Sequence, residues 1–384
     1  MPSSRSKNIL AYLTWWSPSL WHGLQTYARD SGWVLMGNGI ARRAPKIPCR
    51  FDGVIALVSE GDMFDLRRFF PGARIVDIRG LDGFEPDGLV VTDHEGTGRM
   101  AADYLYGLGY RTFVGLDLKK HWRGPRERIA AFIRRARELG VEEARTFVMR
   151  EDWRLEYTMA HPRALRRRLG ALLSKAPAPV GVFAPEDHPA NLVLQEILDL
   201  GYRVPDDVAI LSCNNDRSIC ENARVPISSV DVNLSKLGYE AARLLDRLMK
   251  GETDSPHSVV IAPLGIEKRL STERTSSGDP VVSAIRAYVI EHYMERITAE
   301  HIIQDIHVSR SRAFARFRKV MGYSIGEEIE RVRMERARSL LETTDYKIDA
   351  VARLSGYQST PTFCRMFKQR TGQTPGEARQ GRRP

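Results

Sequence analysis

Residues 309–327 read SRSRAFARFRKVMGYSIGE, and residues 359–377 read STPTFCRMFKQRTGQTPGE. The two stretches match with a period of 50 residues, most clearly at the pairs Ser309 and Ser359, Phe317 and Phe367, Arg318 and Lys368, and Gly322 and Gly372. An internal repeat indicates that one structural unit occurs twice. Each copy follows a short helical stretch and a tight connection, so each copy predicts a helix-turn-helix.

The second helix of each unit carries polar and basic residues around its buried aromatic positions. These residues are Arg310, Ser311, Arg312 and Arg316 in the first unit, and Ser359, Thr360, Thr362, Arg365 and Lys368 in the second. Arginine binds guanine edges and phosphates, and serine and threonine hydrogen-bond to both. We therefore predict that these residues contact double-stranded DNA. The alternative is a helical bundle with a basic surface.

A connecting helix from about Ser324 to Leu341 is predicted by one apolar stripe, formed by Ile325, Ile329, Val332 and Leu340. Roughly 18 residues at about 1.5 Å each give a length of about 27 Å. One turn of DNA is about 34 Å long, so this connector suits two reading helices in successive segments of the major groove.

Positive charge is concentrated in the region of the repeat. The chain of 384 residues carries a net charge of +10, and residues 280–384 hold 19 Lys and Arg against 12 Asp and Glu. Such an excess in a small domain favours a polyanionic partner, with a solvated basic surface as the alternative. Residues 271–279 contain no apolar side chain and are predicted to be a linker.

The composition excludes several classes of protein. At 42% hydrophobic and 28% charged residues, the chain is typical of a folded globular protein. No apolar run approaches the ~18 residues that a membrane-spanning helix needs. The four cysteines are scattered without a Cys-x-x-Cys pair, which argues against zinc and disulfides and fits a reducing cytoplasm. We expect no metal, no cofactor, no secretory signal and no membrane partner.

Residues 8–270 alternate apolar strands with helices of 10–15 residues. The predicted strands are 8–13, 33–36, 53–58, 73–77, 112–116, 180–183 and 208–212, and the predicted helices are 20–31, 98–108, 125–139, 164–174, 191–200 and 234–250. This order indicates parallel sheet covered on both faces. Both one sheet with two lobes and two similar sheets fit this length.

Polar and aromatic residues gather after these strands, where ligands bind in such folds. They include Trp15, Trp16, Asp93, Asp187 and Asn214. Carboxylates and amides hydrogen-bond to hydroxyl groups, and a flat ring covers an apolar C–H face. We therefore predict a site for a sugar or another polyol. The alternative is that the tryptophans are core residues and the acids cap helices.

An enzyme is the rival class of function. Residues Gly96 to Ala101 fit the G-x-G-x-x-A pattern of dinucleotide-binding turns, and Asp117 ends the next strand, so a nucleotide site is an alternative. No P-loop, nucleophile elbow or metal-ligand cluster supports this class, and we predict no catalytic residue. A third hypothesis is a non-specific DNA-coating protein.

Residues 280–384 resemble the DNA-binding domain of AraC-type transcription regulators. The resemblance lies in residues 333–341 (RMERARSLL), 348–357 (IDAVARLSGY) and 363–375 (FCRMFKQRTGQTP). It implies two helix-turn-helix units joined by a long helix. The first unit departs from the family pattern, because Ile303 and His307 stand where Ala and Gly are usual and Ala313 where Leu is usual.

Residues 8–270 resemble the sugar-binding domain of lac-repressor-type regulators, which is similar to periplasmic sugar-binding proteins. Asp93, Arg128, Asp187 and Asn214 fall where that family places ligand contacts, with Asn214 in place of the commoner Asp. Residues 225–230 (VPISSV) and 237–245 (LGYEAARLL) also match. We expect no helix-turn-helix before this domain, unlike in the family, since the first predicted strand begins near Asn8.

Together the resemblances imply a two-lobed α/β periplasmic-binding-protein-like domain (8–270), a linker (271–279) and an all-α double helix-turn-helix domain (280–384). They imply a cytoplasmic, ligand-responsive regulator of a sugar-utilisation operon, with xylose or a related pentose or hexose as its effector. The expected ligand contacts are Trp15, Trp16, Asp93, Arg128, Asp187 and Asn214. The expected partners are operator DNA, the sugar, a second copy of the chain in a homodimer, and RNA polymerase.

Overall fold

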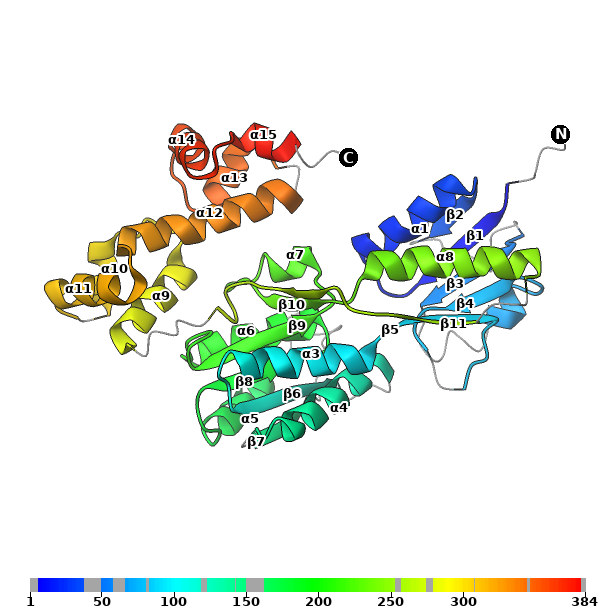
Figure 1. Cartoon of the computed structure of the whole chain (residues 1–384), viewed down its shortest axis with the longest axis horizontal. Coiled ribbons are helices and arrows are strands. Elements are labelled where there is room, and N and C mark those ends of the chain that lie inside the picture. Colours follow the sequence, from blue (N-terminus) through cyan, green and yellow to red (C-terminus); the bar gives the residue numbers. More distant parts are fainter. Residues whose placement is uncertain are drawn as a thin grey trace.

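The computed structural model describes residues 6–37, 50–57, 66–80, 83–118, 123–141, 143–149, 162–252, 257–273, 279–306, 308–343 and 346–380. Two α/β lobes are followed by a helical domain (Figure 1). The predicted fold class, a two-lobed α/β part followed by an all-α part with two helix-turn-helix units, is confirmed. Of the two packings that the sequence allows, two separate sheets are observed.

The first lobe is a six-stranded parallel sheet with the strand order β11-β5-β4-β3-β1-β2. Its strands are β1 (Asn8–Leu13), β2 (Val34–Gly37), β3 (Gly53–Leu57), β4 (Arg74–Asp77), β5 (Gly88–Thr92) and β11 (Ser258–Ile261). In register, Leu10 lies between Met36 and Val54. Helices α1 (Pro18–Asp30) and α8 (Leu234–Lys250) pack against each other, and α8 also packs on β3, β4 and β5.

The second lobe is another six-stranded sheet, with the order β12-β10-β9-β8-β6-β7, in which only β12 is antiparallel. Its strands are β6 (Thr112–Leu118), β7 (Glu143–Met149), β8 (Val180–Phe183), β9 (Val208–Cys213), β10 (Ser228–Asp231) and β12 (Gly265–Glu267). Its helices are α3 (His94–Gly107), α4 (Arg123–Glu138), α5 (Pro162–Leu173), α6 (Asp187–Asp199) and the short α7 (Arg217–Cys220).

Three connections cross between the lobes: from β5 to α3, from β10 to α8, and from β11 to β12 (Figure 1). Each helix that follows a crossing therefore covers the lobe it enters. Such multiple crossings are typical of hinged two-lobed folds, in which a few residues at element ends absorb the change of backbone angle. Asn233, at the entry to α8, has a left-handed φ of 61°.

The glycine pattern at residues 96–101 serves helix packing. A Cβ on Gly98 would lie 2.3 Å from the carbonyl oxygen of Arg128, so only glycine allows α3 and α4 to approach this closely. The amide of Gly96 donates to the side chain of Asp93, which caps α3. A Cβ on Gly96 would also lie 2.2 Å from Asp93 Oδ2, so close contacts account for both glycines without a nucleotide.

The predicted linker begins later than residue 271. Ser271 and Thr272 are buried, and the Ser271 hydroxyl donates to the carbonyl oxygen of Ile210 at 2.5 Å and accepts from the amide of Ser228 at 2.8 Å. The Ser271 hydroxyl therefore satisfies two backbone groups of the second lobe, a role that polar composition alone does not reveal. The described part of the lobe extends to Glu273, and residues 274–278 lie outside the described residues.

The helical domain contains seven helices in its described residues. They are α9 (Pro280–His292), α10 (Ala299–Asp305), α11 (Arg310–Met321), α12 (Ile325–Thr343), α13 (Ile348–Leu354), α14 (Thr360–Thr371) and α15 (Pro375–Gln380). The helix-turn-helix units are α10–α11 and α13–α14, and His307 in the first turn lies outside the described residues. In the second turn Gly356 has a φ of +84°, and a Cβ there would lie 2.1 Å from the Tyr293 carbonyl oxygen.

The long helix α12 contributes to two apolar cores. Its first half buries Ile325, Ile329 and Val332 in the cluster that also contains α9, α11 and part of the second lobe. Its second half buries residues such as Met334 and Leu340 in a separate cluster with α13 and α14. The helix therefore joins the two units mechanically, as the predicted connector requires.

The repeat is visible in the way the helices begin and end. Gly322 and Gly372 end α11 and α14 in the left-handed conformation. The next helix then starts with the same reciprocal cap, in which Glu327 accepts from the Ser324 amide and Glu377 accepts from the Thr374 amide, each at 2.7 Å. Local hydrogen bonding explains why these sequence positions match.

Candidate ligand cavity and DNA-reading helices

A cavity lies between the lobes, beyond the carboxyl ends of strands from both sheets. Its lining combines aromatic and aliphatic side chains with a few convergent polar groups, as small-molecule sites do. The residues are Trp15, Leu57, Ile78, Arg79, Thr92, His94, Gly124, Pro125, Arg128, Glu186, Asn214, Leu234 and Leu237. Such a surface can cover the apolar face of a ligand and hydrogen-bond to its hydroxyl groups.

Arg128 is the central polar group of this cavity. It is buried, and its Nη1 donates to the Pro185 carbonyl oxygen at 2.8 Å and to Asn214 Oδ1 at 3.0 Å, while Nη2 donates to Thr92 Oγ1 at 3.2 Å. Its Nε has no hydrogen-bond partner among the described residues. Because a buried donor without an acceptor is unfavourable, this nitrogen is ready for a ligand oxygen.

The backbone of Asn214 is held in an unusual conformation, with φ at 104°, and the next residue, Asn215, has φ at 54°. Residues in such conformations persist where the surroundings fix them, and they cluster at ligand sites. Here the Asn214 amide donates to the Val230 carbonyl oxygen, and the Asn215 amide donates to Ser229 Oγ, both at 3.0 Å. The turn after β9 thus aims the Asn214 side chain at Arg128.

His94 adds a neutral polar group to the cavity. Burial, together with the positive charges of Arg128 and Arg123, lowers the pKa of its imidazole to about 3. The ring therefore stays uncharged at neutral pH, with one nitrogen as donor and the other as acceptor. Its Nδ1 lies 3.2 Å from Thr92 Oγ1, which also contacts Arg128.

Asp187 lies beneath the cavity rather than in its lining. Its carboxylate accepts hydrogen bonds from the hydroxyls of Ser212 and Ser229 and from the amide of Asp216. Burial raises the pKa of this carboxyl to about 6, although these hydrogen bonds act in the opposite direction. The side chain thus holds together the ends of β9, β10 and α7.

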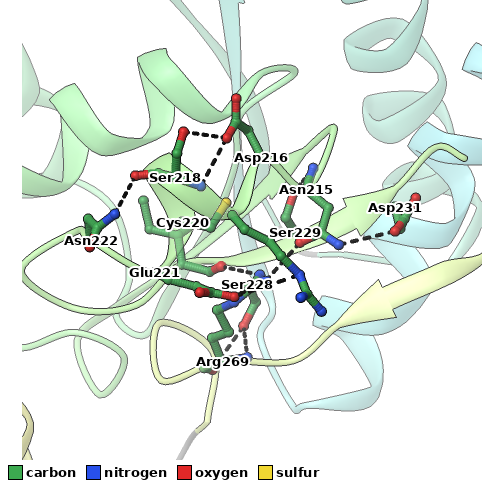
Figure 2. Close-up of polar contacts among 12 residues, drawn as sticks. Asn215, Asp216, Ser218, Cys220, Glu221, Asn222, Ser228, Ser229, Asp231 and Arg269 are labelled. Carbon is green, nitrogen blue, oxygen red and sulfur yellow. Dashed lines mark hydrogen bonds and ion pairs between the residues drawn. The ribbon is translucent and has the colours of Figure 1, made fainter. Parts of the chain in front are cut away.

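A second buried network, centred on Arg269, joins the turn after β9 to the residue that follows α7 (Figure 2). Arg269 donates to Asn215 Oδ1 at 2.8 Å and to the Ile227 carbonyl oxygen at 3.0 Å, and it lies 3.6 Å from Glu221. Asn215 in turn donates to Asp231 at 3.1 Å. Contacts therefore run from the cavity-side turn to α7, which faces the helical domain (Figure 1).

Three of the six predicted ligand contacts line the cavity: Trp15, Arg128 and Asn214. The other three have different positions. Asp93 caps α3, Asp187 belongs to the buried hub, and Trp16 is 42% exposed with its ring 5.2 Å from that of Trp21. Their roles in binding stay predictions.

Several lining residues were not chosen from the sequence. Thr92 and His94 flank Asp93, and Glu186 precedes Asp187. The sequence therefore identified the correct segments after β5 and β8, but the residues selected there are neighbours of those that line the cavity. Ile78 and Arg79 follow β4. Their position after a strand was the available signal, but their residue types did not indicate hydroxyl binding.

The two candidate reading helices show the same pattern of exposure. Ala313 and Phe317 are buried in α11, as are the matching Phe363 and Phe367 in α14. Among the predicted DNA contacts, Arg310, Ser311, Arg312, Ser359, Thr362, Arg365 and Lys368 are exposed and Thr360 is half-buried. Ser359 also caps α14, and Arg310 lies 3.0 Å from Glu300.

Arg316 differs from the other predicted DNA contacts. It occupies the half-buried position that corresponds to Met366 in the repeat, and it lies 3.6 Å from Asp279 at the start of α9. The exposed position equivalent to Arg365 is Ala315 in the first unit. The two units therefore present unequal side chains to a partner.

Comparisons with known proteins match both halves of the chain. Residues 102–272 match the periplasmic binding protein-like domain family, and residues 302–381 match a helix-turn-helix domain family. The xylose operon regulatory protein of Escherichia coli K12 is 29% identical over 300 residues, which cover 78% of this chain and 75% of that protein. The corresponding protein of Haemophilus influenzae is 28% identical, covering 76% and 74%. The chain combines a periplasmic binding protein-like domain with a helix-turn-helix domain, and it is a sugar-responsive, DNA-binding transcription regulator.

Solved structures support the architecture of this regulator. The structure of the xylose-binding transcription activator xylR has a TM-score of 0.76 at 24% identity, and the match covers 99% of the regulator and 100% of that chain. The complex of the transcriptional regulator CelR with cellobiose has a TM-score of 0.56 at 22% identity, covering 71% of the regulator and 86% of that chain. Within its described residues, the regulator contains no helix with the length and apolar character needed to span a bilayer.

Proposed function

We propose that the regulator controls a sugar-utilisation operon, with xylose or a closely related pentose bound between its lobes. The observation that carries this proposal is the cavity geometry. Arg128 is fixed by Asn214 and Thr92 and keeps a free Nε donor, while Trp15 supplies an aromatic surface. The names of the relatives, xylose operon regulatory proteins, support this class of effector.

Sugar binding would favour the closed arrangement of the lobes, because lining residues come from both sheets and touch one ligand only when the lobes approach. A ligand shifts such an equilibrium only by its difference in affinity for the two states. A difference of about 1.4 kcal/mol changes the ratio of the states about tenfold. The three crossing segments are the positions at which the backbone would bend.

Closure of the lobes would change DNA binding through the contacts between the second lobe and the helical domain. Arg224 lies 2.8 Å from Asp199 in the lobe and 2.9 Å from Glu291 on α9. We expect a cytoplasmic homodimer, because two copies present two pairs of reading helices to two half-sites. We also propose that the DNA-bound regulator contacts RNA polymerase.

The test is a thermal-shift and calorimetric screen of pentoses and hexoses on the full-length protein. A ligand at 100 times its dissociation constant stabilises the folded state by about 2.7 kcal/mol. D-xylose or a related pentose should stabilise the protein, and the same sugar should change its affinity for DNA upstream of sugar-utilisation genes. Chemical conversion of the sugar, or stabilisation by NAD instead, would favour the enzyme hypothesis.

A further inference from the structure

A second, larger cleft of about 530 Å³ lies between the second lobe and α12. One wall is formed by α7 and the segment that contains Glu267, Lys268 and Arg269, and the other by residues of α12 with Arg370 from α14. It is distinct from the cavity between the lobes and shares no lining residue with it. Its size is that of a site for a small metabolite.

Arg336 is the most constrained polar group in this cleft. It is 9% exposed, and Nη2 donates to Asn222 Oδ1 at 2.8 Å across the domain boundary. Its Nε and Nη1 are buried and have no hydrogen-bond partner among the described residues. Its charge also has no ion pair with another described residue. A buried guanidinium in this state is costly unless an acceptor is brought to it.

Three of the four glutamates that line the cleft, all except Glu267, already have other partners. Glu330 accepts from the Tyr357 hydroxyl at 2.9 Å, Glu335 lies 3.2 Å from Arg331, and Glu221 lies 3.6 Å from Arg269. The cleft is lined by six arginines and one lysine against four glutamates. Arg338 and Arg370 are exposed there and form no ion pair with another described residue. The side chains that line the cleft therefore carry a net positive charge, and Arg338 and Arg370 expose part of it to the space of the cleft.

We propose that this cleft binds a small phosphorylated metabolite whose phosphate contacts Arg336. Guanidinium groups bind phosphate with short, charge-assisted hydrogen bonds. The phosphate would supply the acceptors that Nε and Nη1 lack, and Arg338 and Arg370 would add attraction at the entrance. The space is larger than a free phosphate requires, so the remainder of the metabolite would lie along Tyr293 and Met334.

Such a ligand would bridge the second lobe and the helical domain. One wall of the cleft belongs to the second lobe and the other to α12. A ligand that contacts both walls would therefore favour one position of the helical domain relative to the second lobe. The operator affinity of the regulator would then report a phosphorylated compound independently of the sugar between the lobes. By linkage, operator DNA would change the affinity of this ligand by the same factor.

Calorimetry on the full-length protein at constant ionic strength tests the proposal, with ribose 5-phosphate and inorganic phosphate as separate probes. Ribose 5-phosphate should bind, and Arg336→Gln should weaken its binding about tenfold or more. Arg370→Gln, at an exposed position, should weaken it less without affecting folding. Arg353→Gln is the matched control, because this exposed arginine pairs with Asp349 on α13, outside the cleft. Equal binding of the two probes would assign the site to free phosphate.

A variant of the other cavity separates the two sites. Arg128→Gln should leave ribose 5-phosphate binding intact if the phosphate lies in the cleft beside α12. Binding that is lost in Arg128→Gln and retained in Arg336→Gln would place the anion between the lobes and overturn the proposal. Failure of both probes to bind the wild-type protein would also overturn the proposal. If Arg336→Gln does not fold, the effect of Arg370→Gln on ribose 5-phosphate binding still tests it.

Discussion

Arg336 on α12 donates a hydrogen bond of 2.8 Å to Asn222, which lies just beyond α7 in the second lobe. The two residues are 114 positions apart in the sequence and belong to different domains. Asn222 also donates to the Ser218 carbonyl oxygen at 2.8 Å, so its orientation is fixed by α7 (Figure 2). The start of α7 is in turn tied to Asp187 through the amide of Asp216. A continuous set of contacts thus connects the base of the ligand cavity with the helix that joins the two DNA-reading units.

Asn222→Ala should reduce the effect of the sugar on DNA binding. The variant removes the contact between the lobe and α12 but leaves the cavity residues in place, so sugar affinity should stay within about twofold of wild type while the ratio of DNA affinities with and without sugar falls toward one. Titrations of operator DNA at fixed salt measure this ratio. Asn191→Ala on α6 is the control, and an unchanged ratio in Asn222→Ala would exclude this contact from the coupling.

Arg128→Gln should strongly weaken sugar binding. Arg128 positions Asn214 and Thr92 and offers its own Nε to the ligand, so its loss removes one charged donor and disorders two neighbouring groups. We expect affinity to fall by about 1.5–3 kcal/mol or more. Isothermal calorimetry measures the loss, and circular dichroism checks the fold. Arg99→Gln, on the exposed side of α3, should bind sugar normally; wild-type affinity in Arg128→Gln would refute the assignment.

Acid should destabilise the helical domain through Glu328. This residue is buried between Arg286 and Arg331, at 2.6 and 2.8 Å, and accepts from Tyr323 at 2.7 Å. Burial acts to raise the pKa of the carboxyl, but the two arginines outweigh it and lower the pKa to about 2. Because the folded state binds the proton less readily than the unfolded state, stability is fully present above about pH 4.5 and is lost as pH falls toward 2.

The corresponding variant is Glu328→Gln. It leaves the buried Arg286 with only the exposed Glu273, 3.5 Å away, as an ion-pair partner, so the free energy of unfolding at neutral pH should fall by about 3 kcal/mol. Denaturant titrations between pH 7 and pH 3 should show a weaker acid dependence than in the wild type. An equal acid dependence in both proteins would show that other carboxyl groups are responsible.

Arg365→Ala should weaken operator binding by about 1–3 kcal/mol, if the residue reads a base. Its side chain is exposed on α14, whereas Arg316 on α11 is half-buried beside Asp279. Arg316→Ala should therefore have the smaller effect. Fluorescence anisotropy with labelled operator at fixed salt compares both with Arg353→Ala on α13. A larger loss of operator affinity from Arg316→Ala than from Arg365→Ala would contradict the expectation that the exposed arginine of α14 contributes more than the half-buried one of α11.

Most strands that the sequence predicted correctly are buried and apolar, although the predicted edge strand β2 contains no buried residue. β1, β3, β8 and β9 lie inside the sheets and consist almost entirely of buried residues. Five strands were not predicted: β5, β7, β10, β11 and β12. β7, β11 and β12 are sheet edges with mixed polarity, and β10 contains Ser228 and Ser229, whose burial depends on partners distant in the sequence. Local pattern does not contain that information.

The candidate site was predictable to the extent that it depends on strand ends. Trp15 lies two residues after β1 and Asn214 directly follows β9, so the general rule for α/β folds finds them. Arg128, in contrast, lies inside α4 and was indicated only by the resemblance to lac-repressor-type regulators. The distinction between Asp187 and its neighbour Glu186 depends on which side chain points inward, and that is decided by the hydroxyls of Ser212 and Ser229.

The most direct test of the central claim is the affinity of the full-length protein for promoter DNA of a sugar-utilisation operon, measured by fluorescence anisotropy with and without D-xylose or the pentose found in the screen. Affinity should fall steeply with added salt, because Lys and Arg release counterions from phosphates. At fixed salt, saturating sugar should change the dissociation constant about tenfold. A dissociation constant that is the same at every sugar concentration, or the same for promoter and unrelated DNA, would contradict the account.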